Sequence, residues 1–290
     1  MADVLITGAS GFLGSSLAAQ LHAQGHRVHA IARPGTVLPD GIDHLVGDLG
    51  DPSFLAALPP RIDTVIHLAQ SRNHRRFPEC ATDIFAVNVQ STALLADYAR
   101  RAGARRFVFT SSGGVYGYRA APWSETDAVA PTNYYLSSKY AAELLLMPYA
   151  SAFPIIILRP FFLYGPGQSG MLIANLIKQV ADGKTVTIDG DQGLRINPCY
   201  LGDAVQAITA TLTLAESATF NLCGDDAATL SGLVAIIAGR LGVAAQVEHR
   251  ATPSPGDLLG DNRRLKRLLG SARLTGLAEG IARTIGQAMP

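Results

Sequence analysis

Short runs of apolar residues alternate along the first half of the chain with longer segments of helical periodicity. The apolar runs have the length of buried strands, and they lie at residues 4–7, 27–32, 64–69, 107–111 and 155–158. Strands that alternate with helices favour a parallel sheet with helices on its faces. The pattern therefore predicts an α/β fold with a doubly wound parallel sheet.

The helical segments carry their own start and stop signals. Between the first two apolar runs, leucines recur every fourth residue, at Leu13, Leu17 and Leu21. Gly25 follows them, where a helix terminator is expected. Residues 86–101 and 135–147 predict two further helices, so the chain begins as a series of βαβ units.

The alternation weakens after Pro160, and Gly165-Pro166-Gly167 form a turn cluster where a second, smaller lobe is expected to begin. Residues 197–211 are apolar enough to return to the sheet domain, so we expect interleaved lobes. The predicted sheet domain comprises residues 1–164 and about 197–216. The predicted C-terminal substrate-binding lobe comprises about 165–196 and 217–290.

Composition narrows the class of protein. With 290 residues, of which 48% are hydrophobic and 16% charged, the chain can bury one or two cores. A net charge of +1 gives no electrostatic footprint for nucleic acid or a membrane surface. Cys80, Cys199 and Cys223 are odd in number and lack metal-ligand spacing, which indicates reduced thiols and no metal site. We expect a cytoplasmic protein without membrane-spanning segments.

Three glycines, Gly8, Gly11 and Gly14, follow the first strand and open the first helix. In that position backbone N–H groups can approach a pyrophosphate at the positive end of the helix, as in a Rossmann domain. The spacing G-x-x-G-x-x-G differs from the usual dinucleotide fingerprint, and a glycine-rich turn occurs in many α/β proteins. The motif therefore needs support from the rest of the chain.

Tyr135 and Lys139 are four residues apart on a predicted helix, so their side chains lie on one face about one turn apart. A phenol has a pKa of about 10, and a nearby cation lowers it toward neutral pH. The pair is therefore a candidate for proton transfer. Two surface residues in helical contact would give the same spacing.

Taken in order, the glycine motif, Ser111-Ser112 and the Tyr135/Lys139 pair resemble the extended short-chain dehydrogenases/reductases, the sugar-nucleotide epimerase, dehydratase and reductase family. The resemblance covers almost the whole chain. Further matching segments are Gly47-Asp48-Leu49, His67-Leu68-Ala69, Asn88-Val89, Val115-Tyr116-Gly117, Arg159-Pro160 and 164–168.

The resemblance implies roles for three catalytic residues. Tyr135 exchanges a proton with a substrate oxygen while hydride passes between the substrate and a nicotinamide. Lys139 lowers the phenol pKa and holds the nicotinamide ribose, and Ser112 donates a hydrogen bond to the reacting oxygen. Asn88 either orders groups near Lys139 or caps a helix.

The same resemblance implies a cofactor site. Its members are Gly8, Ser10, Gly11, Phe12, Leu13, Gly14, Arg33, Asp48, Leu49, Leu68, Ala69, Asn88, Tyr135, Lys139 and Pro160. Where NAD-dependent relatives place an acidic residue after the second strand, this chain has Ala32-Arg33. An arginine can pair with a 2′-phosphate, so NADP(H) is favoured, and NAD(H) stays open.

Residues that the chain lacks narrow the set of reactions that it could catalyse. Dehydratases of the family carry an acidic pair soon after the serine, and here those positions are Gly113-Gly114. Simple redox chemistry at one carbon remains. With the NADP(H) preference, we expect an NADPH-dependent 4-ketoreductase of a nucleotide-linked deoxysugar. The alternatives are an NAD-dependent nucleotide-sugar 4-epimerase, a reductase of small carbonyl compounds, and a non-catalytic NADP-binding regulator.

Two expectations concern partners. Arg195 stands where the family uses an arginine on the diphosphate of a nucleotide sugar, and its planar guanidinium suits that anion. An exposed arginine without a ligand is the alternative. The helices at 86–101 and 135–147 resemble the pair through which the family commonly dimerises. We therefore expect a nucleotide-sugar substrate and a homodimer.

Overall fold

The computed structural model describes residues 1–252, 256–270 and 273–288. The chain divides into two compact units that alternate along the sequence. The first unit consists of Met1–Val115, Val129–Arg159 and Ala207–Phe220. The second consists of Tyr116–Ala128, Pro160–Gln206 and the chain from Asn221 onward.

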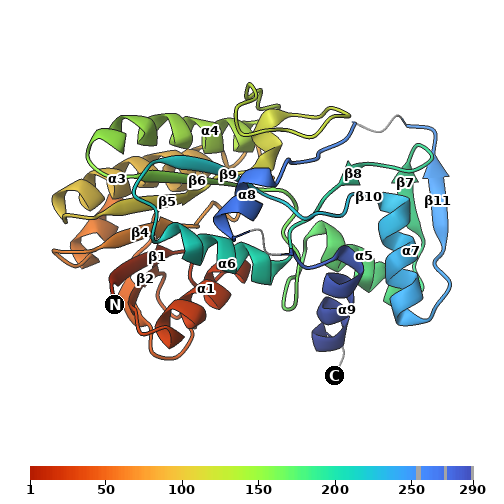
Figure 1. Cartoon of the computed structure of the whole chain (residues 1–290), viewed down its shortest axis with the longest axis horizontal. Helices are drawn as coiled ribbons and strands as arrows, with labels where there is room; N and C mark the ends of the chain where they lie inside the picture. Colours follow the sequence, from red (N-terminus) through yellow and green to blue (C-terminus); the bar gives the residue numbers. More distant parts are fainter. Residues whose placement is uncertain (253–255, 271–272, 289–290) are drawn as a thin grey trace. The chain divides into compact units, whose positions relative to one another are not determined.

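A seven-stranded sheet in the order β3-β2-β1-β4-β5-β6-β9 is central to the first unit (Figure 1). Its strands are β1 (Asp3–Thr7), β2 (Arg27–Ala32), β3 (Asp43–Val46), β4 (Thr64–His67), β5 (Arg106–Thr110), β6 (Ile155–Pro160) and β9 (Ala218–Leu222), the last of which ends in the second unit. The pairs from β3 to β6 are parallel. The order reverses between β1 and β4, where ligands of such sheets bind.

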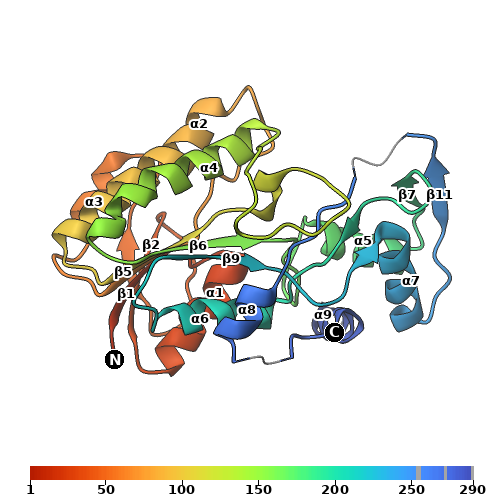
Figure 2. The ribbon, with the colours of Figure 1, turned by 45° about the horizontal axis from the view of Figure 1, so that its top comes forward.

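Helices cover both faces of this sheet, as Figure 2 shows. On one face lie α1 (Phe12–Ala23) and α6 (Leu201–Thr211), whose second half belongs to the first unit. On the other lie α2 (Ala81–Phe85), the π-helix η2 (Ala86–Gln90), α3 (Ser91–Arg101) and α4 (Tyr134–Leu146). The predicted doubly wound α/β fold is therefore confirmed.

Apolar packing holds the α3/α4 face to the sheet. Leu5, Val65, Phe107 and Phe109 from the strands and Leu95, Ala99, Ala142 and Leu146 from the helices are all fully buried. Burying a leucine or phenylalanine side chain stabilises a fold by roughly 1.5–3 kcal/mol. This core fixes α4 and β5, the elements that carry the predicted catalytic residues.

Within its described residues, the second unit contains two small sheets, four whole helices and the first half of α6. The strands β7 (Val186–Asp189) and β11 (Val247–Arg250) pair in parallel, and β8 (Arg195–Ile196) pairs antiparallel with β10 (Ala228–Thr229). The helices are α5 (Leu172–Ala181), α7 (Leu230–Leu241), α8 (Arg263–Leu268) and α9 (Leu277–Ala288), and α7 packs on both α5 and α9.

Short 3-10 helices lie at η1 (Pro52–Ala57), η3 (Gly113–Tyr116) and η4 (Met147–Ser151). The helix predicted at 86–101 begins five residues earlier, at Ala81, because α2, η2 and α3 run on without a break. Cys80 precedes α2 without a side-chain cap, so the sequence carries no start signal there. None of the helices in the described residues combines the length and hydropathy that a membrane crossing requires.

Candidate active site

The glycine turn after β1 depends on close approaches of backbone. Gly8 has a φ of +75°, and a Cβ at this position would lie 2.9 Å from the nitrogen of Ala69. A Cβ on Gly14 would lie 2.1 Å from the carbonyl oxygen of Gly8. Glycine at these positions therefore brings the turn, the start of α1 and the end of β4 together.

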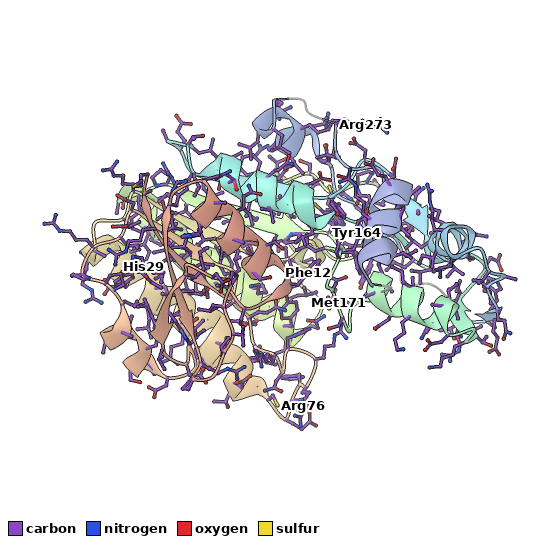
Figure 3. The ribbon with its side chains drawn as sticks, turned by 90° about the horizontal axis from the view of Figure 1, so that it is seen from below. Phe12, His29, Arg76, Tyr164, Met171 and Arg273 are labelled. Carbon is purple, nitrogen blue, oxygen red and sulfur yellow. The ribbon has the colours of Figure 1, made fainter. Side chains whose placement is uncertain are left out.

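The start of α1 is arranged to receive an anion. Gly11 is its N-cap residue and provides no side-chain cap, and the first turn contains no acidic residue. The first N–H groups of a helix have no acceptor within the helix and lie at its positive end. The glycine turn at residues 8–14 and these N–H groups fit the diphosphate of a dinucleotide. The groups include the N–H of Phe12, which is labelled in Figure 3, and that of Leu13.

At the end of β2, Ala32 is followed by the exposed Arg33. Within the described residues the Arg33 guanidinium has no ion-pair partner. The Gly47 N–H donates to the Ala32 carbonyl at 3.0 Å, and this bond ties the Asp48-Leu49 segment to the strand end. The Asp48 carboxylate accepts from the Gly50 N–H at 2.9 Å. The resemblance to the family implies that the adenosine binds at the edge of the sheet where these residues lie.

His67 connects β4 to β1 and α3 through two hydrogen bonds. Its Nδ1 lies 2.6 Å from Thr7 Oγ1, and its Nε2 lies 2.9 Å from Thr92 Oγ1. Thr92 donates its single hydroxyl proton to the carbonyl of Asn88 at 2.8 Å, so Nε2 is the donor and Nδ1 accepts from Thr7. Complete burial lowers the pKa of His67 to about 3, so the ring is neutral at pH 7.

Asn88 lies inside a continuous helix and is almost completely buried. Its Oδ1 accepts from the Ser71 N–H at 2.8 Å, and its Nδ2 donates to Ser138 Oγ at 2.9 Å. Ser138 in turn donates to the carbonyl of Tyr135 at 2.7 Å. Asn88 therefore does not cap a helix; it connects the loop after β4 to the helix that carries Tyr135 and Lys139.

The helix α4 is fixed at its start by Asn133, whose side chain accepts from the Leu136 N–H at 3.0 Å. Tyr135 follows in the first turn, and its hydroxyl donates to Gln70 Oε1 at 2.7 Å. Lys139 lies one turn later and is 1% exposed. The structure thus gives both residues ordered surroundings at the carboxyl end of β4.

Burial determines the electrostatics of this pair. It raises the pKa of Tyr135 to about 12 and lowers the pKa of Lys139 to about 7, the latter against the opposing effect of Glu143. The sequence predicts that Lys139 lowers the pKa of the Tyr135 phenol toward neutral pH. In the protein alone, burial instead raises that pKa. The reason is that removal from water disfavours both the phenolate and the ammonium.

Ser112 follows β5, and its Oγ accepts from the Gly114 N–H at 3.1 Å. A Cβ on Gly114 would lie 2.9 Å from Leu136 Cδ2 and 3.4 Å from the serine Oγ. The serine turn therefore packs against the Leu136 side chain of α4, and a larger residue at 114 would displace the end of that side chain. The hydroxyls of Thr110 and Ser111, just before Ser112, are buried and have no hydrogen-bond partner among the residues that the structure describes.

Two of the predicted site residues, Pro160 and Arg195, belong to the second unit. Arg195 Nε donates to Asp257 Oδ2 at 3.0 Å, and its terminal nitrogen donates to the carbonyl of Ala120 at 3.2 Å. Its side chain is 43% exposed. A diphosphate at Arg195 would therefore share the guanidinium with an existing ion pair.

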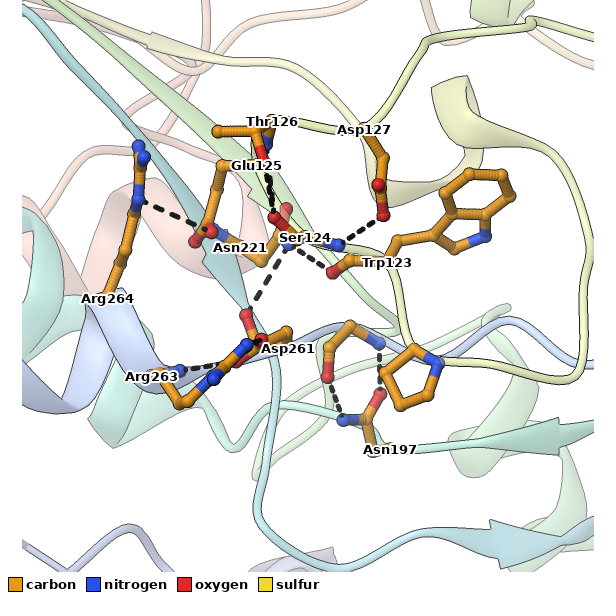
Figure 4. Close-up of polar contacts among 12 residues, drawn as sticks. Trp123, Ser124, Glu125, Thr126, Asp127, Asn197, Asn221, Asp261, Arg263 and Arg264 are labelled. Atoms are coloured by element: carbon orange, nitrogen blue, oxygen red, sulfur yellow. Dashed lines mark hydrogen bonds and ion pairs between the residues drawn. The ribbon is translucent and has the colours of Figure 1, made fainter.

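A polar network holds residues 116–128 within the second unit (Figure 4). The fully buried Asn221 accepts from the Tyr116 hydroxyl at 2.9 Å and donates to the carbonyl of Trp123 at 2.8 Å. Its own N–H donates to Glu125 Oε1 at 3.0 Å. This network holds these residues in the second unit, whereas the pattern of the sequence places them in the predicted sheet domain.

Sequence reasoning missed Gln70 and Glu143. Glu143 lies one turn beyond Lys139, is 2% exposed and accepts from Arg159 Nε at 3.0 Å. Continuing the four-residue spacing from Tyr135 through Lys139 would have found it. Gln70 lies three residues after the end of β4, but an exposed glutamine carries no signal of its own. Arg76, in the basic loop that follows, is exposed (Figure 3).

Comparison with known proteins places the chain among nucleotide-sugar enzymes. Residues 4–223 match the NAD dependent epimerase/dehydratase family. The UDP-glucose 4-epimerase of Mycolicibacterium smegmatis is 32% identical, over 97% of this chain and 96% of that protein. The dTDP-glucose 4,6-dehydratase of Streptomyces griseus is 30% identical, over 97% and 92%.

Among solved structures, MoeE5 in complex with UDP-glucose and NAD has a TM-score of 0.86 and 32% sequence identity, covering 99% of this chain and 98% of that one. The resemblance drawn from the ordered motifs is thereby confirmed. The chain belongs to the NAD-dependent epimerase/dehydratase family, within the extended short-chain dehydrogenases/reductases.

Proposed function

We propose that this protein is an NAD-dependent 4-epimerase of a UDP-linked hexose. The observation that carries the proposal is the joint placement of Tyr135, Lys139 and the Ser112 turn, with Gly114 packed on α4. The similarity of the chain to a UDP-glucose 4-epimerase supports the reaction and the nucleotide.

In the proposed reaction Tyr135 takes the proton of the C4 hydroxyl as C4 loses a hydride, and returns it when the hydride is given back to the other face of the ketone. Ser112 donates a hydrogen bond to the C4 oxygen, where charge develops. NAD⁺, when bound, supplies the hydride acceptor and a positive charge that favours the phenolate. Lys139 holds the nicotinamide ribose.

The remaining site residues receive proposed roles. The turn from Gly8 through Ser10 and Gly11 to Gly14 holds the diphosphate together with the start of α1. Asp48 and Leu49 lie at the adenine, and Leu68, Ala69 and Pro160 at the nicotinamide. Arg195 contacts the diphosphate of the sugar nucleotide, in exchange for part of its pairing with Asp257.

Dehydration is disfavoured although one relative is a dehydratase. Elimination of water needs an acid and a base near the sugar, and Gly113-Gly114 offer neither. Redox chemistry at a single carbon needs no such acid–base pair at these two positions, so the glycines favour it.

NADPH-dependent 4-ketoreduction is the second candidate, and Arg33 favours it. Its guanidinium is exposed after β2 and has no ion-pair partner in the described part of the chain, so it can receive a 2′-phosphate. The similarity to MoeE5, which was solved with NAD, supports NAD instead. We place the epimerase first for this reason.

The experiment uses purified protein with UDP-glucose, NAD and no added reductant, followed by chromatography of the nucleotide sugars. The expected result is UDP-galactose accumulating to equilibrium, with loss of the reaction in Tyr135→Phe. Tyr134→Phe is the matched control, since that hydroxyl donates only to the Ala81 carbonyl at 3.3 Å. Turnover that requires NADPH and a 4-keto sugar would replace the epimerase by the reductase.

A homodimer is proposed through the helices on the α4 face. Phe85, Leu144 and Met147 are 50%, 54% and 58% exposed there, although such side chains are usually buried. Sedimentation analysis of the protein and of Leu144→Glu tests this. A dimer that becomes monomeric supports the proposal, and a wild-type monomer contradicts it.

A further inference from the structure

The ammonium of Lys139 lies over the face of a buried aromatic ring. Its Nζ is 4.6 Å from the ring centroid of Phe109, within the range of about 6 Å for a cation–π contact. Phe109 lies in β5 and is 0% exposed, and Lys139 is 1% exposed. The contact is removed from water, which is the condition that makes a cation–π interaction strongest.

The charged and titratable groups around Lys139 do not by themselves keep its side chain protonated. Glu143 on α4 favours the ammonium, but its carboxylate also pairs with Arg159. His67 on β4 is neutral and fully buried, and the pKa of His74, in the loop after β4, is lowered by its own burial, with a smaller effect of Lys139. Burial itself disfavours the ammonium. Any further group that favours the ammonium therefore raises the charged fraction of Lys139.

A phenylalanine ring suits this position better than a second carboxylate would. The ring face attracts a cation, but it accepts no strong hydrogen bond. In the described residues Nζ makes no hydrogen bond to protein, so its three N–H groups stay available to ligand oxygens. A carboxylate at the same place would take up those donors.

We propose that Phe109 is a positioning residue whose ring face holds the Lys139 ammonium charged and in place, one turn from Tyr135. The consequence for catalysis rests on the proposed function. The effect on the charge of the lysine does not, because it follows from the contact between the two side chains.

The test weakens the ring face without changing its size. Phenylalanines with one, two and three fluorine atoms are introduced at 109, since fluorine withdraws electron density from the face that attracts the cation. The protein carries ¹³Cε-labelled lysine, and NMR follows the titration of the Lys139 signal, which is identified by its loss in Lys139→Met. Phe107 is the matched control because it lies two residues earlier on β5 and is equally buried.

The expected result is a stepwise fall of the Lys139 pKa, by about one unit for the trifluorinated ring at 109 and without change for the same ring at 107. A Lys139 pKa that is insensitive to fluorination at 109, or equally sensitive at both positions, overturns the proposal.

Activity is measured on the same samples. If the titration shifts as expected but the unmodified protein converts no UDP-sugar, the proposed function fails while the Phe109 contact stands. If the protein is active and fluorination at 109 leaves both the titration and the pH dependence of kcat unchanged, only the contact fails.

Discussion

The carboxylate of Glu143 and the guanidinium of Arg159 form an ion pair inside the first unit, with their side chains 3% and 7% exposed. The pair joins α4 to β6, one helical turn beyond Lys139. A buried charge that loses its partner keeps the penalty of leaving water. The pair therefore ties the position of the proposed catalytic helix to the stability of the fold.

Glu143→Gln is expected to lower the free energy of unfolding by about 3–5 kcal/mol, because it removes the carboxylate charge that balances the buried guanidinium of Arg159. Urea denaturation measures this change. The control is Glu279→Gln, which removes a pair that is about half exposed, with Arg283, and is expected to change stability by less than about 1 kcal/mol. Equal small effects for the two variants would contradict the account.

Stability is also expected to rise with pH above neutrality. Lys139 has a pKa of about 7 in the folded protein and 10.5 as its ordinary value. Between these values the unfolded chain binds a proton that the folded protein lacks, so raising the pH favours the folded state, and below pH 7 this gain is absent. Unfolding measured from pH 7 to 9.5 should show the rise, and Lys139→Met should flatten it. An unchanged slope in Lys139→Met would contradict the burial of this charge.

Gly14→Ala is expected to weaken NAD binding at least about tenfold, because the new Cβ would lie 2.1 Å from the carbonyl oxygen of Gly8 and displace the turn. Isothermal titration with NAD measures the affinity. Gly239→Ala is the control: it lies in α7 with no atom within 4 Å of its new Cβ, and should stabilise the protein by about 0.5–1 kcal/mol. NAD binding by Gly14→Ala at the wild-type affinity would rule out the proposed role of the glycine turn in holding the diphosphate.

The hydrogen bond from Tyr135 to Gln70 predicts a pH effect at residue 70. Gln70→Glu places a negative charge beside the phenol, raises its pKa further and should lower kcat/KM at pH 7 by about tenfold or more. Gln70→Met removes the polar group at similar size and should cost only a few-fold. The loss in Gln70→Glu should shrink as the pH rises, and a pH-independent loss would show that the charge does not act on Tyr135.

The sheet and its flanking helices could be predicted because apolar periodicity is a local property. The strand at 27–32 and the helix found at Tyr134–Leu146 follow directly from it. The strand β3 escaped notice because it has only four residues, three of them exposed and two of them polar, at the edge of the sheet. The place of residues 116–128 depends on Asn221, almost a hundred residues later, and no local pattern carries that information.

The candidate site likewise has features that the sequence predicts and features that it does not. The spacing of Tyr135 and Lys139 and the glycines of the first turn are readable in the sequence. Their electrostatics are not, because the pKa values follow from burial, which needs the packed structure. The packing of Gly114 against Leu136 is likewise not readable in the sequence, because the two residues approach each other only in the fold.

The most direct test of the central claim follows an isotope through the reaction. UDP-glucose carrying deuterium at C4 is incubated with the protein and NAD in ordinary water, and the product is analysed by mass spectrometry and NMR. Hydride removal and return at C4 predicts UDP-galactose that retains the deuterium at C4, with no product from Tyr135→Phe. Loss of the deuterium to solvent, or no UDP-galactose at all, would contradict the account.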